Sequence, residues 1–415
     1  MMMNEKTWHF VHEHLDDDVR ILALRGTKDD EVDLPMAIQQ IAGRQMARRK
    51  LPSWAEVEGI IYPPHLNMEQ CSSEQTARYK ATIVNGQSDN GTFVDLTGGF
   101  GIDFYWLSQG FQHRYYIEQN EALCAVSSKN FALLGLDCTV CCRDAVAYLA
   151  TMVEPVSLIY LDPARRNEHG GRTYSIEDCT PNVLKLLPLL MAKTNRVMLK
   201  LSPMLDWRKA VEDIQKLTDE SQKRIAYVSE VHIISVDNEC KELILLVSRE
   251  QTKNMRLVCV NGASSFEVFP TRTNNPHPER DDLSLLEKRT FAIGETAFLY
   301  EPNASIMKAG CFEEVEIRYP VRQIAPNSHL FVSADEIADF PGRKFEITAI
   351  SSMNKHELKA ALPASKQANI TVRNFPMTAQ QLRQKLKMKE GGAVYLFATT
   401  LADNSHRLFI CRKIG

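Results

Sequence analysis

Apolar residues in the middle of the chain fall into short runs that alternate with longer amphipathic stretches. The runs are apolar along most of their length, which is typical of strands buried on both faces. These runs are Thr92–Leu96, Tyr115–Glu118, Cys138–Cys142, Val156–Asp162 and Arg196–Leu201. Helical stretches such as Asn120–Leu134 and Thr180–Lys193 lie between them. This alternation predicts an α/β fold, in which helices cover both faces of a parallel sheet.

Two later runs, Ile225–Val236 and Lys241–Val247, are joined by a short polar segment and predict an antiparallel hairpin added to the parallel sheet. Met255–Val260 and Phe266–Phe269 are candidates to extend it. The polar, proline-containing stretch Thr271–Asp282 then predicts a linker. We therefore expect a sheet domain over residues 87–272, a small unit over 273–325 and a last unit over 326–415.

Residues 1–86 predict a separate helical region. Asp33, with Pro35 in the first turn, is typical of a helix start. Ser72 with Gln75 predicts a capping box for a second helix that runs through Lys80. In the last unit the pattern is strand, helix, strand, helix, strand, strand, and a second capping box pairs Thr378 with Gln381.

Composition is that of an ordinary globular protein, with 44% hydrophobic and 24% charged residues among 415. This excludes disordered, collagen-like and coiled-coil classes. No run reaches the roughly 18 apolar residues of a membrane span, and the first residues lack a signal-peptide pattern. We expect a cytoplasmic protein with free thiols. The Cys138-x-x-Cys141-Cys142 segment lies in an expected strand without a second ligand pair, so packing is favoured over zinc or redox chemistry.

The first chemical signal is the segment Asp95-Leu96-Thr97-Gly98-Gly99-Phe100-Gly101, which joins an expected strand to an expected helix. Glycines there allow a sharp turn and a close approach of the backbone to a ligand. The dinucleotide-binding spacing G-x-G-x-x-G fails because residue 104 is phenylalanine, and the lysine of a P-loop is absent. An NAD-dependent dehydrogenase is therefore disfavoured.

Acidic residues follow the expected strands in register with this turn. Glu118 ends the second strand, Asp144 follows the third and Asp162 ends the fourth. In open parallel sheets, ligands bind at the carboxyl ends of the strands. One such acid alone is typical of a helix cap or a solvated loop. Four acids with a glycine turn predict a ligand site.

The turn and the acids resemble those of class I S-adenosylmethionine-dependent methyltransferases. Five further segments are similar to a bacterial family that joins such a domain to a ferredoxin-like domain and a C-terminal THUMP-like domain. These segments are 162–166, 201–206, 300–303, 340–343 and 369–376. The resemblance implies a Rossmann-like sheet, S-adenosyl-L-methionine as cofactor and, through the THUMP-like domain, an RNA partner such as rRNA or tRNA.

The resemblance also implies roles for single residues. Glu118 would accept hydrogen bonds from the ribose hydroxyls, and Asp144 would accept one from the adenine amine. Asp95 and the glycine turn would lie near the methionine portion. The cofactor-binding residues implied in this way are Asp95, Thr97, Gly98, Gly99, Gly101, Glu118, Asp144 and Asp162. No metal is implied.

The segment Asp162-Pro163-Ala164-Arg165 departs from the Asp/Asn-Pro-Pro-aromatic motif of amino-directed methyltransferases, so methylation of an adenine or guanine amine is in doubt. It is similar to the motif of the RNA uracil-C5 enzymes. Those enzymes need a cysteine after the fifth strand, where this chain has Ser202-Pro203. Direct methyl transfer is the simpler interpretation, and Cys179 is only a weak candidate nucleophile.

In this interpretation Asp162 is the catalytic residue that orients the acceptor and can take its proton. Arg165 is a second catalytic candidate, and with Arg166 it could hold a phosphate or carboxylate of the substrate. A salt bridge that stabilises the loop is the alternative for both arginines. Lys80 is a weaker candidate of the same anion-binding kind.

The net charge of −3 hides a basic segment, since residues 343–389 carry ten basic and two acidic residues. On the helix after Thr378, Arg383/Lys387 and Lys385/Lys389 would form outward pairs of like charge, which favours an anionic partner over a merely solvated face. Arg373 and Lys385 are the predicted substrate-binding residues. Phe375 could stack on a base, although a core position is more typical. A protein or small-molecule methyltransferase, and a non-catalytic RNA-binding protein that keeps the cofactor pocket, stay open as alternatives.

Overall fold

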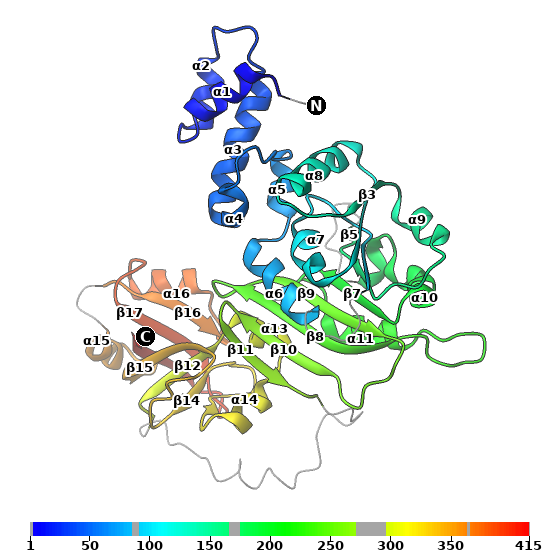
Figure 1. The fold of residues 1–415 in the computed structure, drawn as a ribbon. Coiled ribbons are helices and arrows are strands. Elements are labelled where there is room, and N and C mark those ends of the chain that lie inside the picture. Colours follow the sequence, from blue (N-terminus) through cyan, green and yellow to red (C-terminus); the bar gives the residue numbers. More distant parts are fainter. Residues whose placement is uncertain (1–2, 85–90, 166–174, 271–295, 363–365, 415) are drawn as a thin grey trace. The chain divides into compact units, whose positions relative to one another are not determined.

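The computed structural model describes residues 3–84, 91–165, 175–270, 296–362 and 366–414 (Figure 1). The chain divides into two compact units. The first comprises Met1–Val231 with Leu243–Lys253, and the second comprises His232–Glu242 with Asn254–Gly415. The predicted linker Thr271–Asp282 lies outside the described residues.

The first unit begins with helices, as the sequence predicts. They are α1 (Glu5–Glu13), α2 (Val19–Arg25), α3 (Leu34–Lys50), α4 (Pro52–Ala55), α5 (His65–Gln70) and α6 (Glu74–Val84). Asp33 caps α3 by accepting a hydrogen bond from the Met36 amide at 3.1 Å, which confirms the predicted helix start. The segment after α4 is tied to the sheet domain by the buried Asn130, which accepts from the Ile61 amide and donates to the Ile61 carbonyl.

The predicted capping box at Ser72 is wrong. Helix α6 begins at Glu74, and the residue that accepts a hydrogen bond from its first turn is Ser73, from the Thr76 amide at 3.2 Å. The Ser72 hydroxyl donates instead to Asp103 at 2.7 Å. A buried carboxylate competes successfully for this hydroxyl because an unsatisfied buried charge is far more costly than an open helix end.

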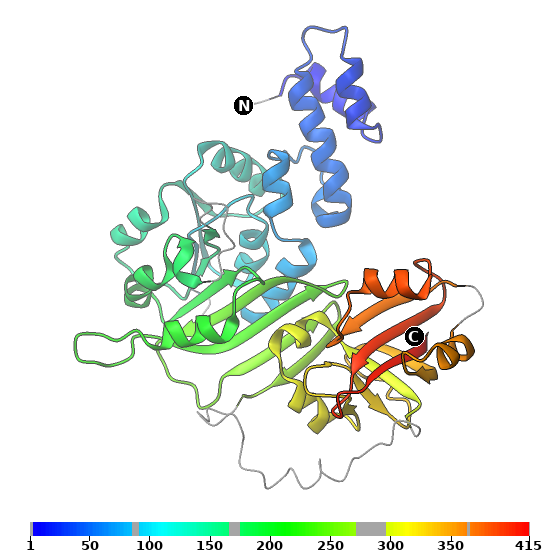
Figure 2. The same cartoon turned by 180° about the vertical axis from the view of Figure 1, so that it is seen from behind.

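The predicted parallel sheet is confirmed. Strands β1 (Thr92–Asp95), β2 (His113–Glu118), β3 (Thr139–Cys142), β4 (Leu158–Leu161) and β7 (Arg196–Leu201) pair in parallel in the order β7-β4-β1-β2-β3. Figures 1 and 2 show helices on both sides of it. These helices are α7 (Ile102–Leu107), α8 (Glu121–Leu133), α9 (Ala145–Thr151), α10 (Val183–Lys193) and α11 (Trp207–Gln215).

Beneath the turn that follows β1, four aromatic rings form a compact core. Phe104 of α7 packs on Phe93 of β1, on Tyr116 of β2 and on Phe131 of α8, with ring centroids 5.1–5.9 Å apart. All four side chains are fully buried. Aromatic pairs at such distances add about 0.5–1.5 kcal/mol each beyond their area burial, so this core fixes the start of α7 against the sheet.

The predicted hairpin is also present, as β8 (Tyr227–Val236) and β9 (Glu239–Ser248), and β9 pairs antiparallel with β7. The outer end of this hairpin belongs to the second unit, with β10 (Arg256–Asn261) and β11 (Ser264–Val268). In the second unit, Asn238 at the hairpin turn accepts a hydrogen bond from the Ala304 amide at 2.7 Å. Helix α13 (Ala304–Ala309) is thereby anchored on the hairpin.

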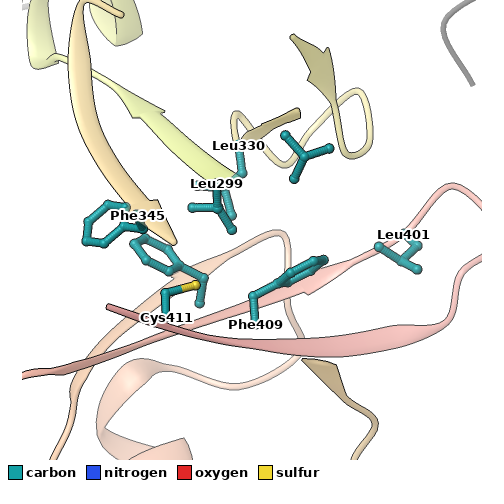
Figure 3. Close-up of a cluster of buried hydrophobic side chains, with 8 residues drawn as sticks. Leu299, Leu330, Phe345, Leu401, Phe409 and Cys411 are labelled. Carbon is teal, nitrogen blue, oxygen red and sulfur yellow. The ribbon is translucent and has the colours of Figure 1, made fainter. Parts of the chain in front are cut away.

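The rest of the second unit is a sheet of seven strands in the order β13-β14-β12-β15-β18-β17-β16. The strands are β12 (Phe298–Pro302), β13 (Arg322–Gln323), β14 (Phe331–Ser333), β15 (Gly342–Ser351), β16 (Asn369–Arg373), β17 (Val394–Thr400) and β18 (His406–Ile414). One core cluster includes Leu299, Phe345 and Phe409 (Figure 3). A second cluster includes Leu382, Leu396 and Leu408. Helices α14 (Phe312–Arg318), α15 (Lys355–Ala361) and α16 (Ala379–Leu386) complete the unit.

The predicted order from β15 to β18 is confirmed, and so is the capping box of Thr378 with Gln381. The predicted pairs of like charge on the last helix are wrong. Helix α16 ends at Leu386, and Lys387 takes a left-handed conformation with φ of 53°. Lys387 and Lys389 therefore lie beyond the helix, where the spacing of four residues no longer places side chains on one face.

Candidate functional site

The glycine turn after β1 has room for glycine alone at two positions. A Cβ atom on Gly98 would lie 2.2 Å from the Tyr116 ring, and one on Gly101 would lie 2.5 Å from the Phe131 ring. Gly99 and Gly101 also have positive φ angles of 57° and 83°, which side-chain-bearing residues rarely adopt. The aromatic rings thus leave no space for a side chain at Gly98 and Gly101. The glycine turn lies at the carboxyl end of the sheet.

Glu118, at the end of β2, lies against this turn. Its carboxylate accepts hydrogen bonds from the Gly99 amide and the Asn120 amide, both at 2.8 Å. The side chain is half-buried. The structure therefore brings together two of the predicted cofactor-binding residues, Gly99 and Glu118.

Asp95 and Thr97 connect the turn to the end of β4. The Asp95 carboxylate is buried and accepts from the Thr97 amide at 2.9 Å. The Thr97 hydroxyl in turn accepts from the Asp162 amide at 2.7 Å. Burial raises the pKa of Asp95 well above its usual range, although the hydrogen bonds from Thr97 act in the opposite direction. Asp95 thus shapes the turn from beneath it.

Asp144 stands apart from this group. It is exposed and caps α9 by accepting from the Ala147 amide at 2.9 Å. Among the described residues, no hydrogen bond or ion pair joins it to the turn. It follows β3, which pairs with β2 so that Cys142 lies opposite Glu118. Its place beside the end of β2 is thus as the sequence predicts, while its contacts here are those of a helix cap.

A chain of four alternating charges runs from the interior to Asp162. Lys80 of α6 contacts Asp103 of α7 at 2.7 Å, and Asp103 contacts Lys200 of β7 at 3.4 Å. Lys200 then contacts Asp162 at 2.7 Å. The side chains of Lys80, Asp103 and Lys200 are 0%, 10% and 11% exposed, whereas that of Asp162 is 37% exposed. Asp162 is therefore the one member of this chain that a ligand can reach readily.

Asp103 is the centre of the chain. One of its oxygens accepts hydrogen bonds from the Ser72 hydroxyl and the Tyr160 hydroxyl, each at 2.7 Å. The Lys80 ammonium donates to Ser72 at 2.7 Å. Burial alone would raise the pKa of Asp103, but Lys80 and Lys200 lower it below its ordinary value. Asp103 is therefore a carboxylate throughout the neutral range.

For Asp162 the same two effects on the pKa, burial and neighbouring cations, balance in the opposite direction. Desolvation raises the pKa of Asp162, and Lys200 opposes this rise through its charge and its hydrogen bond. The Lys200 contact is made by one carboxylate oxygen, Oδ2. In the part of the chain that the structure describes, no donor is bonded to the other oxygen. Asp162 thus has one oxygen bonded to Lys200 and one without a hydrogen-bond donor among the described residues.

The residues after Asp162 turn into a short ribbon. Strand β5 (Ala164–Arg165) pairs with β6 (Cys179–Thr180), so Arg165 lies opposite Cys179. Cys179 is buried, with 5% of its surface exposed. The predicted substrate residue Arg166 lies outside the described residues. For Arg165 the structure describes the backbone.

The sequence patterns do not indicate Asp103, Tyr160 or Lys200, and they predict Lys80 as a residue that binds an anion of the ligand. The Lys80 side chain is fully buried and forms an ion pair with Asp103. A signal was present, because Lys200 interrupts an otherwise apolar strand and lysine is almost never buried without a partner. Nothing in the spacing pointed to the partner, which is 38 residues distant.

In the second unit, Arg373 contacts a buried acid. Glu301 of β12 is 2% exposed and accepts from Arg373 at 2.8 Å and from Arg343 at 2.7 Å. The two arginine side chains are about one-third exposed. Three of the segments that carry the family resemblance, 300–303, 340–343 and 369–376, therefore meet at one ionic cluster. Arg373 is at least partly used in holding it together.

The basic segment divides into paired and unpaired residues. Arg343, Lys344, Arg373 and Arg383 have acidic partners within 4 Å. The other basic residues of segment 343–389 are exposed lysines, for which the described residues supply no carboxylate partner. We call them the lysine set: Lys355, Lys359, Lys366, Lys385, Lys387 and Lys389. The predicted substrate residue Lys385 belongs to it, and the Lys389 amide donates to the Lys366 carbonyl, which brings two of its segments together.

The described residues contain no group of three or more His, Cys, Asp and Glu side chains arranged to hold a metal ion. Within the same residues, every helix is too short or too polar to cross a membrane.

Comparisons with known proteins agree with the architecture. The sequence model of a ferredoxin-like domain family matches residues 298–341, and that of a THUMP domain-like family matches residues 342–413. The structure is similar to that of a proposed methyltransferase from Porphyromonas gingivalis W83, with 29% identity, complete coverage of both chains and a TM-score of 0.78. Comparison with curated protein sequences gives no match.

Two other solved structures resemble part of the chain. One is a proposed class I S-adenosylmethionine-dependent methyltransferase from Listeria monocytogenes (11% identity, 63% of this chain, 94% of that chain, TM-score 0.40). The other is a proposed methyltransferase from Streptococcus mutans in complex with SAH (12%, 43%, 97%, 0.31). The resemblance predicted from the sequence, a methyltransferase-like sheet followed by ferredoxin-like and THUMP-like segments, is confirmed.

Proposed function

We propose that this protein is a class I S-adenosylmethionine-dependent methyltransferase that methylates RNA by direct transfer. The observation that carries the proposal is the arrangement at the carboxyl end of the sheet. There the glycine turn, Glu118 and the exposed end of Asp162 lie on successive strands around β1. The likeness over the whole chain to a proposed methyltransferase supports it.

The residues of the turn fit the cofactor. Gly99 has no atom closer than 3.8 Å to the place of a Cβ, so its backbone is open to a ligand. Glu118 offers two carboxylate oxygens beside it, as a pair of ribose hydroxyls requires. Asp144 offers an exposed acceptor after the adjacent strand. Thr97 and Asp162, joined by a hydrogen bond, close the site towards β4.

The transfer needs little from the protein beyond alignment and a proton acceptor. Bound S-adenosylmethionine supplies an electrophilic methyl group on a positively charged sulfur. A lone pair of the acceptor would form the new bond to the methyl carbon as the carbon–sulfur bond breaks. The bonding pair would stay on the sulfur of the departing S-adenosylhomocysteine, and the acceptor would lose a proton. Asp162 accepts a hydrogen bond from the N–H or O–H of the acceptor, which aligns it, and takes that proton.

A carbon acceptor is disfavoured by the cysteines. Methylation at C5 of a pyrimidine requires a thiolate, and the thiolate forms readily where cations or a helix end lower the thiol pKa. Cys179 is only 5% exposed, so its thiol is poorly accessible to a pyrimidine ring. Cys71 precedes Ser72, but its thiol donates to the Met68 carbonyl and burial raises its pKa.

The lysine set supports RNA as the substrate. Six lysines that are exposed and without described acidic partners lie in a domain that matches a THUMP-like family, and their charges suit phosphate groups. We propose Lys385 as a phosphate contact. Arg165, Arg166 and Arg373 stay candidate substrate residues, Arg373 with a share of its charge neutralised by Glu301.

All ten cysteines are free thiols, which fits a cytoplasmic location.

Calorimetry with S-adenosylmethionine tests the cofactor assignment. Glu118→Ala removes two acceptors of hydrogen bonds to the ribose, so we expect the dissociation constant to rise about 10- to 100-fold. Glu121→Ala, an exposed acid in the first turn of α8, is the matched control and should bind as the unaltered protein does. Binding of NADH without binding of S-adenosylmethionine would refute the proposal.

A further inference from the structure

We propose that Lys200 is a positioning residue, which holds Asp162 as a carboxylate with one oxygen turned towards the methyl acceptor. In this proposal the buried pair of Lys80 and Asp103 fixes Lys200 in place. The inference rests on the proposed function, because it assigns Asp162 to the acceptor. It goes beyond that function by naming the residues that determine the state of Asp162.

The geometry gives each oxygen of Asp162 a different task. Lys200 contacts Oδ2 at 2.7 Å, and the Asp162 backbone amide donates to Thr97 at 2.7 Å. Backbone and side chain are thus both held. The remaining oxygen belongs to the most exposed side chain of the charge chain, at the same end of the sheet as the glycine turn. An acceptor therefore meets an oriented carboxylate oxygen.

The charges around Asp162 come from four elements. Lys200 lies on β7, Asp103 on α7, Lys80 on α6 and Asp95 on β1. Lys200 favours the carboxylate form of Asp162, while Asp103 disfavours it. Asp103 also attracts Lys200, so it competes with Asp162 for the same ammonium group.

Stability alone does not explain this arrangement. Removing two lysines and Asp103 from water is costly, and well-packed apolar residues of similar volume are often equally or more stabilising. In addition, the hydroxyl groups of Ser72 and Tyr160 donate hydrogen bonds to Asp103. A fixed set of buried dipoles and charges that ends on one accessible carboxylate is the arrangement expected where the carboxylate must be oriented before substrate binds.

The protonation of Asp162 can be measured without any substrate. A carbodiimide with glycine ethyl ester reacts with protonated carboxyl groups, and the modified peptide is identified by mass spectrometry across a series of pH values. Asp162→Asn identifies the site, since it must abolish the modification there. With Lys200→Met we expect the labelling of Asp162 to persist to a pH about 1–2 units higher, because an adjacent cation lowers a carboxyl pKa by about this amount.

A second variant must shift the labelling in the opposite direction. Asp103→Asn removes a negative neighbour and leaves Lys200 to Asp162 alone, so labelling should end at a lower pH than in the unaltered protein. Lys200→Arg keeps the cation and should restore most of the unaltered profile. Lys209→Met, an exposed lysine paired with Asp213, is the matched control and should change nothing.

Equal labelling profiles in the unaltered protein and in Lys200→Met would overturn the proposal. If that variant does not fold, an unchanged or upward shift in Asp103→Asn would overturn it instead. Methyl transfer to total RNA from a strain that lacks the gene is measured in parallel over the same pH range, and its acidic limb should move with the labelling. The labelling could shift to higher pH in Lys200→Met and to lower pH in Asp103→Asn while no methyl group is transferred to RNA. That result would support the role of Lys200 and refute the proposed function.

Discussion

Two buried carboxylates, one in each unit, are each held by two cations, but the clusters are built in opposite ways. Asp103 lies between two lysines that are themselves buried, and the charge continues through Lys200 to the exposed Asp162. Glu301 is buried between two arginines that are each about one-third exposed, and the charge ends there.

The difference indicates different purposes. In the second unit a single acid of β12 contacts Arg343 of the neighbouring strand β15 and Arg373 of β16, which ends the other side of the sheet. The cluster therefore connects β12 and β15 to a strand that is distant in the sheet order. In the first unit the cluster ends on a carboxylate beside the glycine turn. We therefore interpret the Glu301 cluster as structural and the Asp103 cluster as part of the proposed active site.

The largest expected effect comes from neutralising each central acid. Asp103→Asn leaves two lysines buried with one remaining acid, and should lower the free energy of unfolding of the first unit by about 3–5 kcal/mol. Glu301→Gln should cost the second unit about 2–3 kcal/mol, because its arginines can turn to water. All four tryptophans lie in the first unit, so their fluorescence follows that unit and circular dichroism follows both.

The control for these variants is Glu346→Gln. Glu346 pairs with Arg412 on the surface, and exposed pairs contribute about 0–1 kcal/mol. The comparison fails if Glu301→Gln lowers the tryptophan transition as much as Asp103→Asn does.

The next effect concerns RNA binding, which we assign to the second unit. Replacing Lys366, Lys385, Lys387 and Lys389 by Gln should weaken binding to a structured RNA at moderate salt by about 100-fold and lower the salt slope by about 3. Fluorescence anisotropy over a range of salt concentrations measures both. Lys209→Gln with Lys216→Gln, two paired lysines of the first unit, should leave the slope unchanged. An unchanged slope in the fourfold variant would show that RNA binds elsewhere.

A smaller effect is expected at Asp95. Its pKa is raised by burial in the folded protein, so the folded state retains this proton at pH values where the unfolded chain, with an ordinary value near 3.8, has lost it. Stability should therefore fall as the pH rises above 4 through this window. Asp95→Asn keeps the acceptor for Thr97 and removes the dependence, so the variant should be the more stable protein at pH 7. Denaturant unfolding at pH 4, 5.5 and 7 measures this, and equal pH dependence would contradict it.

The smallest effect is expected at the cysteines. Direct transfer needs no thiol, so Cys71→Ala and Cys179→Ala should each retain methyl transfer within about threefold, less than the loss of a positioned general base would cause. Loss of activity together with a covalent RNA adduct in the unaltered protein would instead assign a nucleophile and a carbon acceptor.

The parallel sheet could be predicted because buried parallel strands form apolar runs, and the turn could be predicted because the glycines are adjacent in sequence. The charge chain could not. Its members come from residues 72–80, 103, 160–162 and 200, and each taken alone has an ordinary local interpretation. Ser72 matches the sequence pattern of a helix cap, but its hydroxyl donates to the buried Asp103 carboxylate instead. The spacing of Lys385 and Lys389 predicts that they share one helix face, but α16 ends at Leu386 and Lys387 takes a left-handed conformation. A long-range hydrogen bond decided the first outcome and a local left-handed helix end decided the second. The spacing of the residues carries no information about either.

The most direct test of the account is tritium transfer from S-adenosylmethionine to RNA of a strain that lacks the gene. The unaltered protein should label RNA, Asp162→Asn should reduce the rate by about 100-fold or more, and Glu121→Ala should label as the unaltered protein does. Label found only in protein or small molecules, or equal labelling of RNA by Asp162→Asn, would contradict the central claim.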